Sequence, residues 1–136
     1  MDFSPIKISM TPEHRTQNEI LAKLGSRHDI RLFRNNTATG WQGRFISRSL
    51  GRLILDNPVP IHAGLFKGSG DLIGWKTVEI NGRQYAVFLS IEVKSARGIV
   101  TREQQLWREK VNTSGGIAIV ARSVEEAEKL IAEMSV

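Results

Sequence analysis

The sequence predicts an α/β fold in which helices flank a mixed central sheet. Two adjoining strand segments over residues 71–80 and a longer one over residues 83–94 are separated by Asn81-Gly82, a dipeptide typical of tight hairpin turns. The continuous apolar run from Gly116 to Ala121 is typical of a buried parallel strand. A helix that links the hairpin to this run must form a crossover, so the sheet should be mixed and covered by helices.

The first half of the chain predicts one clear helix. Thr11 is the expected N-cap, Pro12 occupies the first helical position, and the helix should end at Gly25. A short strand is expected from Asp29 to Phe33. The region from Arg44 to Leu55 is predicted to be a helix, or a helix followed by a strand.

Two further helices are expected in the second half, and each begins with a capping pattern. Thr101 is followed three residues later by Gln104, and Ser123 is followed in the same way by Glu126. The predicted order is therefore helix, strand, hairpin of two strands, helix, strand and helix.

Length and composition indicate one domain. A chain of 136 residues can bury a substantial core, which we expect over residues 11–136 after a lead-in of residues 1–10. No apolar run approaches the roughly 20 residues that span a bilayer, and the N-terminus lacks the layout of a signal peptide. The absence of cysteine excludes disulfides and thiolate metal sites. We therefore expect no membrane partner and a cytoplasmic location, which is the host cytoplasm if the protein is phage-encoded.

The charge balance favours a polyanionic partner. The formal net charge is +5 and the sequence pI is about 10.0. Arginine and lysine gather in the first half of the chain, whereas acidic residues concentrate near the C-terminus. Nucleic acid is the polyanion that this distribution favours.

The stretch "FLSIEVKSARG" carries two opposite charges on a strand that otherwise reads as buried. Leu89, Ile91 and Val93 share one face, and Glu92 and Lys94 share the other with Ser90. One interpretation is an exposed salt bridge on an edge strand, which contributes about 0–1 kcal/mol. The other is a catalytic pair.

Asp71 strengthens the catalytic interpretation because it begins the neighbouring strand. Magnesium prefers oxygen ligands and usually takes one or two carboxylates together with water. Asp71 and Glu92 can supply these carboxylates, the Val93 carbonyl a third oxygen, and Lys94 can reach a metal-bound water or a phosphate. Zinc is a poor competitor, because the three histidines lack the spacing of zinc motifs.

The flanking sequences show a resemblance to a known family. The chain reads "KGSGDLIG", "IEVKSARG", "TREQQLW" and "GGIAIVARS", preceded by Glu19 on the first helix. This resembles the VRR-NUC family of the PD-(D/E)xK nuclease superfamily, in its small stand-alone phage and bacterial form, over most of residues 11–131. The resemblance implies a restriction-endonuclease-like core with the order αβββαβ. Gly70 departs from the proline that often precedes the aspartate in the superfamily.

The resemblance also implies a reaction and a set of site residues. The reaction is hydrolysis of DNA phosphodiester bonds with Mg²⁺ or Mn²⁺ as cofactor. The implied metal ligands are Asp71, Glu92, the Val93 carbonyl and Glu19, the last either directly or through water. Lys94 would position or activate the attacking water, and Gln104 would join the site. Two alternatives stay open: Glu19 as an ordinary exposed carboxylate, and Gln104 as a capping residue only.

Basic and polar residues supply the expected DNA contacts. Arg44, Arg48 and Arg52 recur at four-residue spacing, so a helix there would align them on one face. Arg34 and Asn36 lie where the family carries a similar Arg-Asn segment. The remaining candidates flank the carboxylates in sequence: Lys67, Ser69, Ser95 and Arg97.

The small members of the family resemble Holliday-junction resolvases, which implies branched DNA as substrate and a homodimer with twofold symmetry. Residues 38–60 could supply the dimer surface. A non-catalytic DNA-binding module with the same fold is the main alternative, although binding alone needs no such set of carboxylates, lysine and glutamine. A nuclease directed at RNA is a weaker alternative.

Overall fold

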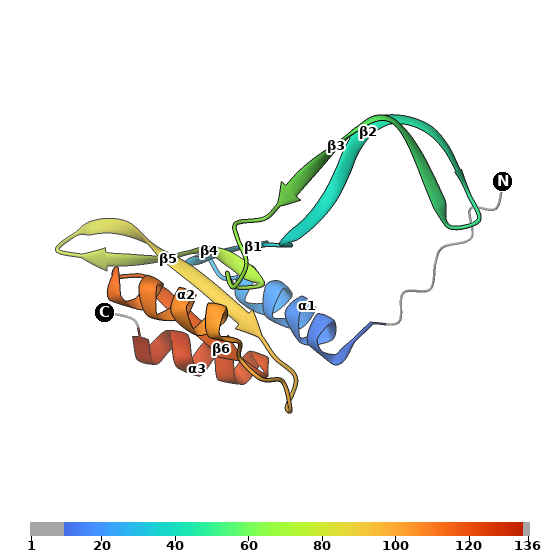
Figure 1. Cartoon of the computed structure of the whole chain (residues 1–136). Helices are drawn as coiled ribbons and strands as arrows, with labels where there is room; N and C mark the ends of the chain where they lie inside the picture. Colours follow the sequence, from blue (N-terminus) through green and yellow to red (C-terminus); the bar gives the residue numbers. More distant parts are fainter. Residues whose placement is uncertain (1–9, 135–136) are drawn as a thin grey trace.

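The computed structural model describes residues 10–134, so residues 1–9 of the predicted lead-in lie outside the described part. The first described residue, Met10, is exposed. In chain order the elements are α1 (Pro12–Gly25), β1 (Ile30–Arg34), β2 (Ala38–Ser49), β3 (Arg52–Ala63), β4 (Leu72–Ile80), β5 (Arg83–Val93), α2 (Arg102–Thr113), β6 (Ile117–Ala121) and α3 (Val124–Met134) (Figure 1).

The central sheet is mixed, as the sequence predicts. Its strand order is β1-β4-β5-β6, with β1, β4 and β5 antiparallel and β6 parallel to β5. The run "IAIVA" is thus the parallel strand that the crossover through α2 requires. The arrangement agrees with the restriction-endonuclease-like core that the family resemblance implies.

Helices cover both faces of the sheet. Leu89, Ile91 and Val93 of β5 are fully or almost fully buried in one apolar cluster with side chains of α1 and α3. On the opposite face of β5, Ser90 accepts a hydrogen bond from Trp107 Nε1 of α2 at 2.9 Å. Both faces of the strand that carries Glu92 are therefore enclosed at its C-terminal end.

Local signals set the ends of these elements. The Thr11 hydroxyl accepts a hydrogen bond from the His14 amide, and Thr101 forms a complete capping box with Gln104. Asn81 and Gly82 have φ angles of 52° and 76°, the left-handed pair that a tight hairpin turn needs. These predictions are confirmed.

The prediction of a helix between Arg44 and Leu55 is wrong, because this region forms the long antiparallel hairpin β2–β3. A four-residue spacing of arginines fits one face of a strand as well as one face of a helix, so the spacing alone cannot distinguish a helix from a strand in this region. Aromatic and β-branched residues favour the strands. The turn falls at Leu50 and Gly51, with φ angles of 49° and 73°.

The β2–β3 hairpin, called the arm below, forms a two-stranded sheet of its own and projects away from the rest of the described chain (Figure 1). Seven large apolar side chains on its two strands are 40–64% exposed, which shows that they do not belong to the core. They are Trp41, Phe45, Ile46, Leu53, Ile54, Val59 and Ile61. Among residues 10–134, no helix combines the length and apolar character needed to cross a membrane.

Gly74 gives a test of the sheet, because a Cβ atom there would collide with the Arg31 carbonyl of the adjacent strand β1. We expect Gly74→Ala to destabilise the protein by about 1–3 kcal/mol, since β1 must move to make room. Gly25→Ala is the matched control, because nothing lies within 4 Å of a Cβ at that position. Thermal unfolding followed by circular dichroism measures both, and equal melting temperatures would contradict this account.

Candidate active site

Strand pairing brings the two predicted carboxylates together. Leu72 of β4 pairs with Ile91 of β5, so Asp71 lies one residue further on, at the level of Glu92. The Asp71 Oδ2 atom accepts a hydrogen bond from the Val93 backbone N–H at 2.8 Å. Asp71 is therefore tied directly to the strand that carries Glu92.

Glu92 contacts both predicted partners. Its Oε1 atom lies 3.4 Å from Lys94 Nζ and accepts a hydrogen bond of 2.5 Å from Gln104 Nε2. The side chains of Lys94 and Glu92 are only 13% and 10% exposed, which rules out the simple surface salt bridge. Gln104 also caps α2 through its Oε1 atom, so its two proposed roles are compatible.

The carboxylates are held in an environment that disfavours their negative charge. Burial raises the pKa of Glu92 to about 7; the negative charge of Asp71 adds to this effect, and Lys94 opposes it. Burial also raises the pKa of Asp71, against the lowering effects of the Val93 N–H and of Lys94. A cation bound between them would relieve both effects.

The structure brings Glu13, and not Glu19, to this group. Glu13 Oε1 accepts a hydrogen bond from the Ser95 backbone N–H at 3.1 Å, and its charge raises the pKa of both Asp71 and Glu92. Glu19 is exposed and lies beside α3, where it lines a shallow hollow with Val124.

The packing of α1 explains this placement. Its buried residues are Gln17, Ile20 and Leu24, and Glu13 extends the same stripe by one turn toward the N-terminus. Glu19 follows Gln17 by two residues and so points elsewhere. The sequence contains a signal for the placement of Glu13. Gln17 is a polar residue on the same helical stripe as the apolar Ile20 and Leu24, and it marks the side of the helix that approaches the site.

The donor set fits a hard cation that keeps much of its water. Asp71, Glu92 and the Val93 carbonyl are oxygen donors, and one or two carboxylates suffice for Mg²⁺ or Mn²⁺. Within residues 10–134, no three histidine, aspartate or glutamate side chains are grouped closely enough to enclose a metal by themselves. A cation held by these groups would need water and substrate oxygens to complete its coordination.

Ser69, one of the predicted DNA contacts, has a structural role. It is 8% exposed, its hydroxyl donates to the Phe66 carbonyl at 2.7 Å, and it accepts from Asn35 Nδ2 at 2.8 Å. Gly70 beside it packs so closely on Ser90 that a Cβ atom would collide with the Ser90 hydroxyl. This explains why the chain has a small residue where the superfamily often has proline.

Several other predicted DNA contacts lie around the carboxylates. Arg34 donates to Gln17 and Asn18 of α1. Ser95 directly follows Lys94, and Arg97 is exposed two residues further on. Lys67 is exposed on the loop before Asp71, with its Nζ atom 3.4 Å from Glu103 Oε1.

The remaining predicted contacts lie on the arm or at its base. Arg44, Arg48 and Arg52 are exposed on its strands and do not form a helical face; Arg44 is paired with Asp56 at 2.6 Å. Asn36 is exposed just before β2.

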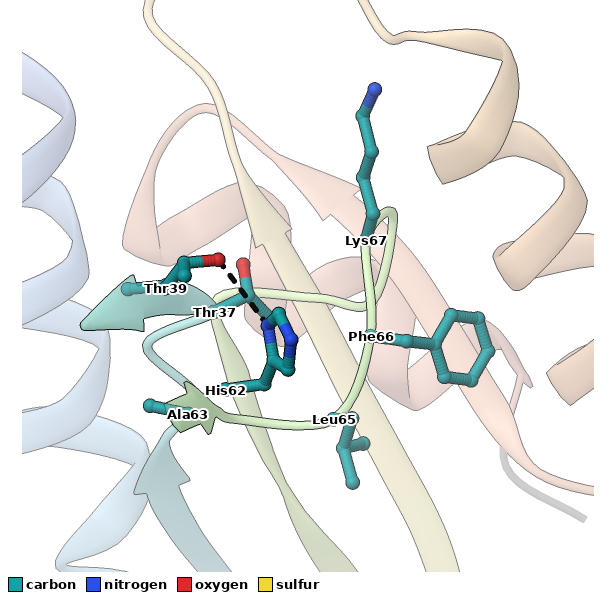
Figure 2. A pocket seen from close by; sticks show the side chains of 8 residues that line it. Thr37, Thr39, His62, Ala63, Leu65, Phe66 and Lys67 are labelled. Atoms are coloured by element: carbon teal, nitrogen blue, oxygen red, sulfur yellow. Dashed lines mark hydrogen bonds between the residues drawn. The ribbon is translucent and has the colours of Figure 1, made fainter. Parts of the chain in front are cut away.

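A hollow at the base of the arm is distinct from the carboxylate site. Figure 2 shows it lined by Thr37, Thr39, His62 and Leu65, with Thr39 Oγ1 3.3 Å from His62 Nδ1. Its volume is about 440 Å³, and none of the described residues that line it is acidic. The hollow therefore offers no carboxylate to a metal ion.

The fold is an α/β domain with a mixed sheet flanked by helices, and one edge of this sheet carries the carboxylate group. The family model described as the VRR-NUC domain matches residues 61–125. This match confirms the family predicted from the motifs, and the matched segment contains Asp71, Glu92, Lys94 and Gln104. A VRR-NUC domain is a nuclease-type module that acts on DNA. No curated protein and no solved structure matches the chain.

The raised pKa of Glu92 predicts how stability depends on pH in the metal-free protein. Because the pKa is about 7 in the folded state and 4.5 as the ordinary value, the stability associated with protonated Glu92 is lost as the pH rises through 7. Glu92→Gln keeps the group neutral. The melting temperature of the variant minus that of the unaltered chain should therefore increase by about 3 °C or more as the pH rises from about 5 to about 8.

Differential scanning calorimetry in the presence of a chelator measures this difference. Glu19→Gln is the matched control, because Glu19 is exposed and distant from the carboxylate pair. A difference between the Glu92 variant and the unaltered chain that stays constant with pH would contradict the buried, charge-crowded environment of Glu92.

Proposed function

We propose that this protein is a Mg²⁺- or Mn²⁺-dependent DNA endonuclease that cuts branched DNA such as four-way junctions. The observation that carries the proposal is the grouping of Asp71 and Glu92 at adjacent strand positions, with Lys94 and Gln104 both in contact with the Glu92 carboxylate. A protein that only binds DNA has no need to bury two carboxylates beside a lysine.

The protein groups have separate roles in this proposal. Asp71, Glu92 and the Val93 carbonyl hold the cation. Gln104 fixes the Glu92 carboxylate by its hydrogen bond. Lys94 is held within 3.4 Å of Glu92, where its ammonium group can orient the attacking water and balance charge on the phosphate.

The bound cation supplies Lewis-acid chemistry: it lowers the pKa of coordinated water and offsets negative charge on the scissile phosphate. Glu13 takes the role that the family resemblance assigned to Glu19. Its carboxylate accepts from the Ser95 N–H, which leaves it able to contact the cation through a water molecule. Glu13 therefore adds negative charge on the α1 side of the site.

The DNA backbone would be held by basic and polar groups on both sides of the carboxylates. Arg34, Lys67, Ser95 and Arg97 lie on the segments that frame the site. Asn36, Arg44, Arg48 and Arg52 extend this surface along the arm. Contacts of this kind bind phosphates without reading sequence, which suits an enzyme that recognises DNA shape.

The arm supports a homodimer. An isolated two-stranded hairpin is marginally stable in water, and the arm exposes large apolar side chains on both of its strands. The Arg44–Asp56 ion pair partly cancels the positive charge of the arm. The exposed apolar side chains of the arm would therefore be better covered by the same apolar surface of a second copy than by water. Two copies related by a twofold axis would present two active sites to the two symmetry-related strands of a junction.

Cleavage of a labelled four-way junction in Mn²⁺ tests the catalytic assignment. We expect Asp71→Asn and Lys94→Ala to reduce the cleavage rate at least about a hundredfold, because they remove a cation ligand and the water-orienting ammonium group. Circular dichroism shows whether each variant is folded. Unchanged rates in folded variants would overturn the site assignment, and rapid cleavage of RNA instead of DNA would overturn the substrate.

The two helical carboxylates form a matched pair for a second test. Glu13→Gln should slow junction cleavage by about tenfold or more, because it removes a negative group beside the cation. Glu19→Gln makes the same chemical change six residues away on the same helix and should leave the rate unchanged. The reverse outcome would restore Glu19 as the residue that serves the site.

Light scattering during size-exclusion chromatography tests the dimer. Phe45→Asp places a charge on the apolar arm and should convert a dimer into a monomer, because an unpaired buried charge is costly. Ile99→Asp is the control, since Ile99 is 84% exposed but belongs to the loop between β5 and α2 and not to the arm. A monomeric unaltered chain, or a dimer that survives Phe45→Asp, would contradict this interface.

A further inference from the structure

Asn35 is a buried polar side chain beside the site whose amide makes three hydrogen bonds, yet the proposed reaction gives it no role. It is 7% exposed and directly follows β1. Its Nδ2 atom donates to Ser69 Oγ and to the Gly70 carbonyl, both at 2.8 Å. Its Oδ1 atom accepts from the Leu65 N–H at 3.0 Å. One amide thus holds three points of the segment that runs from the arm to Asp71.

The backbone of Asn35 continues this hold to the catalytic aspartate. The Asn35 N–H donates to the Asp71 carbonyl at 2.8 Å, and the Asp71 carboxylate accepts from the Val93 N–H. Asp71 is therefore fixed by two groups, one through its main chain and one through its side chain. Asn35 binds the main-chain carbonyl of Asp71, so the role that this bond supports is positioning.

The base of the arm is fitted around the same residue. Gly64, with a φ of 78°, lies so close that a Cβ atom there would be 3.0 Å from Asn35 Oδ1 and 2.8 Å from the Asn36 carbonyl. The Leu65 N–H bonded to Asn35 belongs to the next residue. A displacement of the arm's base therefore changes the bonds that place Asp71.

We propose that Asn35 is a positioning residue that sets the place of Asp71, and with it the affinity of the site for a divalent cation, and that it ties this place to the base of the arm. The inference rests on the proposed function, because it takes Asp71 to be a cation ligand.

The chemistry of the amide makes the role specific. The position needs an N–H donor toward Ser69 and Gly70 and an oxygen acceptor toward Leu65. Aspartate has nearly the same shape but lacks the donor, so it would place a carboxylate oxygen against the Gly70 carbonyl. Asn35→Asp also adds a negative charge near the site, which by electrostatics alone should strengthen cation binding. The positioning role predicts the opposite effect, namely weaker cation binding in Asn35→Asp.

Calorimetric titration of the DNA-free protein with Mn²⁺ tests the proposal without any measurement of cleavage. We expect Asn35→Asp to weaken Mn²⁺ binding about tenfold or more, the usual effect of losing a residue that orients a metal ligand. Asn36→Asp is the matched control: it adds the same charge one residue away, but Asn36 is exposed. The titration contains no DNA, so the DNA contact proposed for Asn36 plays no part in it. It should leave the affinity unchanged or slightly stronger.

A second control separates positioning from general loss of stability. Ile131→Val removes one methylene group from the core beneath α3 and destabilises the fold away from Asp71. Titrations are run well below both melting temperatures. Mn²⁺ affinity should be unchanged in Ile131→Val, and an equal loss in this variant would reduce Asn35 to a purely structural residue.

The two proposals fail in different ways. If the unaltered chain shows no Mn²⁺ uptake that depends on Glu92, the proposed metal site itself is overturned, and the role of Asn35 with it. If the unaltered chain binds Mn²⁺ and folded Asn35→Asp binds it equally well, the positioning role alone is overturned.

Discussion

The antiparallel register between β4 and β5 is the constraint on which the site depends. Pairing of Leu72 with Ile91 sets Asp71 at the level of Glu92, and it leaves the Val93 N–H free to bind the Asp71 carboxylate. A shift of one residue would turn Glu92 toward the apolar cluster and Ile91 toward the site. The tight turn after β4 and the close contact of Gly70 with β5 both hold this register.

Negative charge is concentrated at this point more than the local lysine can balance. Glu13 and Gln104 both lie in the first turn of a helix, so the N-termini of α1 and α2 converge on the end of β5. The partial positive charge of helix N-termini stabilises nearby carboxylates. The fold thereby tolerates acidic groups whose pKa values are already raised, and a bound cation would complete the balance.

Local sequence patterns predicted the elements that local interactions determine. The caps at Thr11 and Thr101, the Asn81-Gly82 turn and the parallel strand all have short-range causes. The arm was missed because its regular arginine spacing fits the period of a helix and that of a strand equally well. Its strands are also almost wholly exposed, so their sequence shows no alternation of apolar and polar residues. The proximity of Glu13 to the carboxylates was missed because it depends on how α1 packs against the sheet, although the buried Gln17 indicated the side of the helix that faces the site. The grouping of Asp71, Glu92, Lys94 and Gln104 was predictable because strand pairing and a helix cap place all four.

The arm leaves and re-enters the body of the protein through one narrow neck. A Cβ atom on Gly64 would lie 2.8 Å from the Asn36 carbonyl, so the two ends of the arm nearly touch. β1 and β4 are already neighbours in the sheet, and an ordinary short turn could join them there. The arm is thus a module on a fixed base: a change in its length, tip or apolar surface need not disturb the strands that carry Asp71 and Glu92.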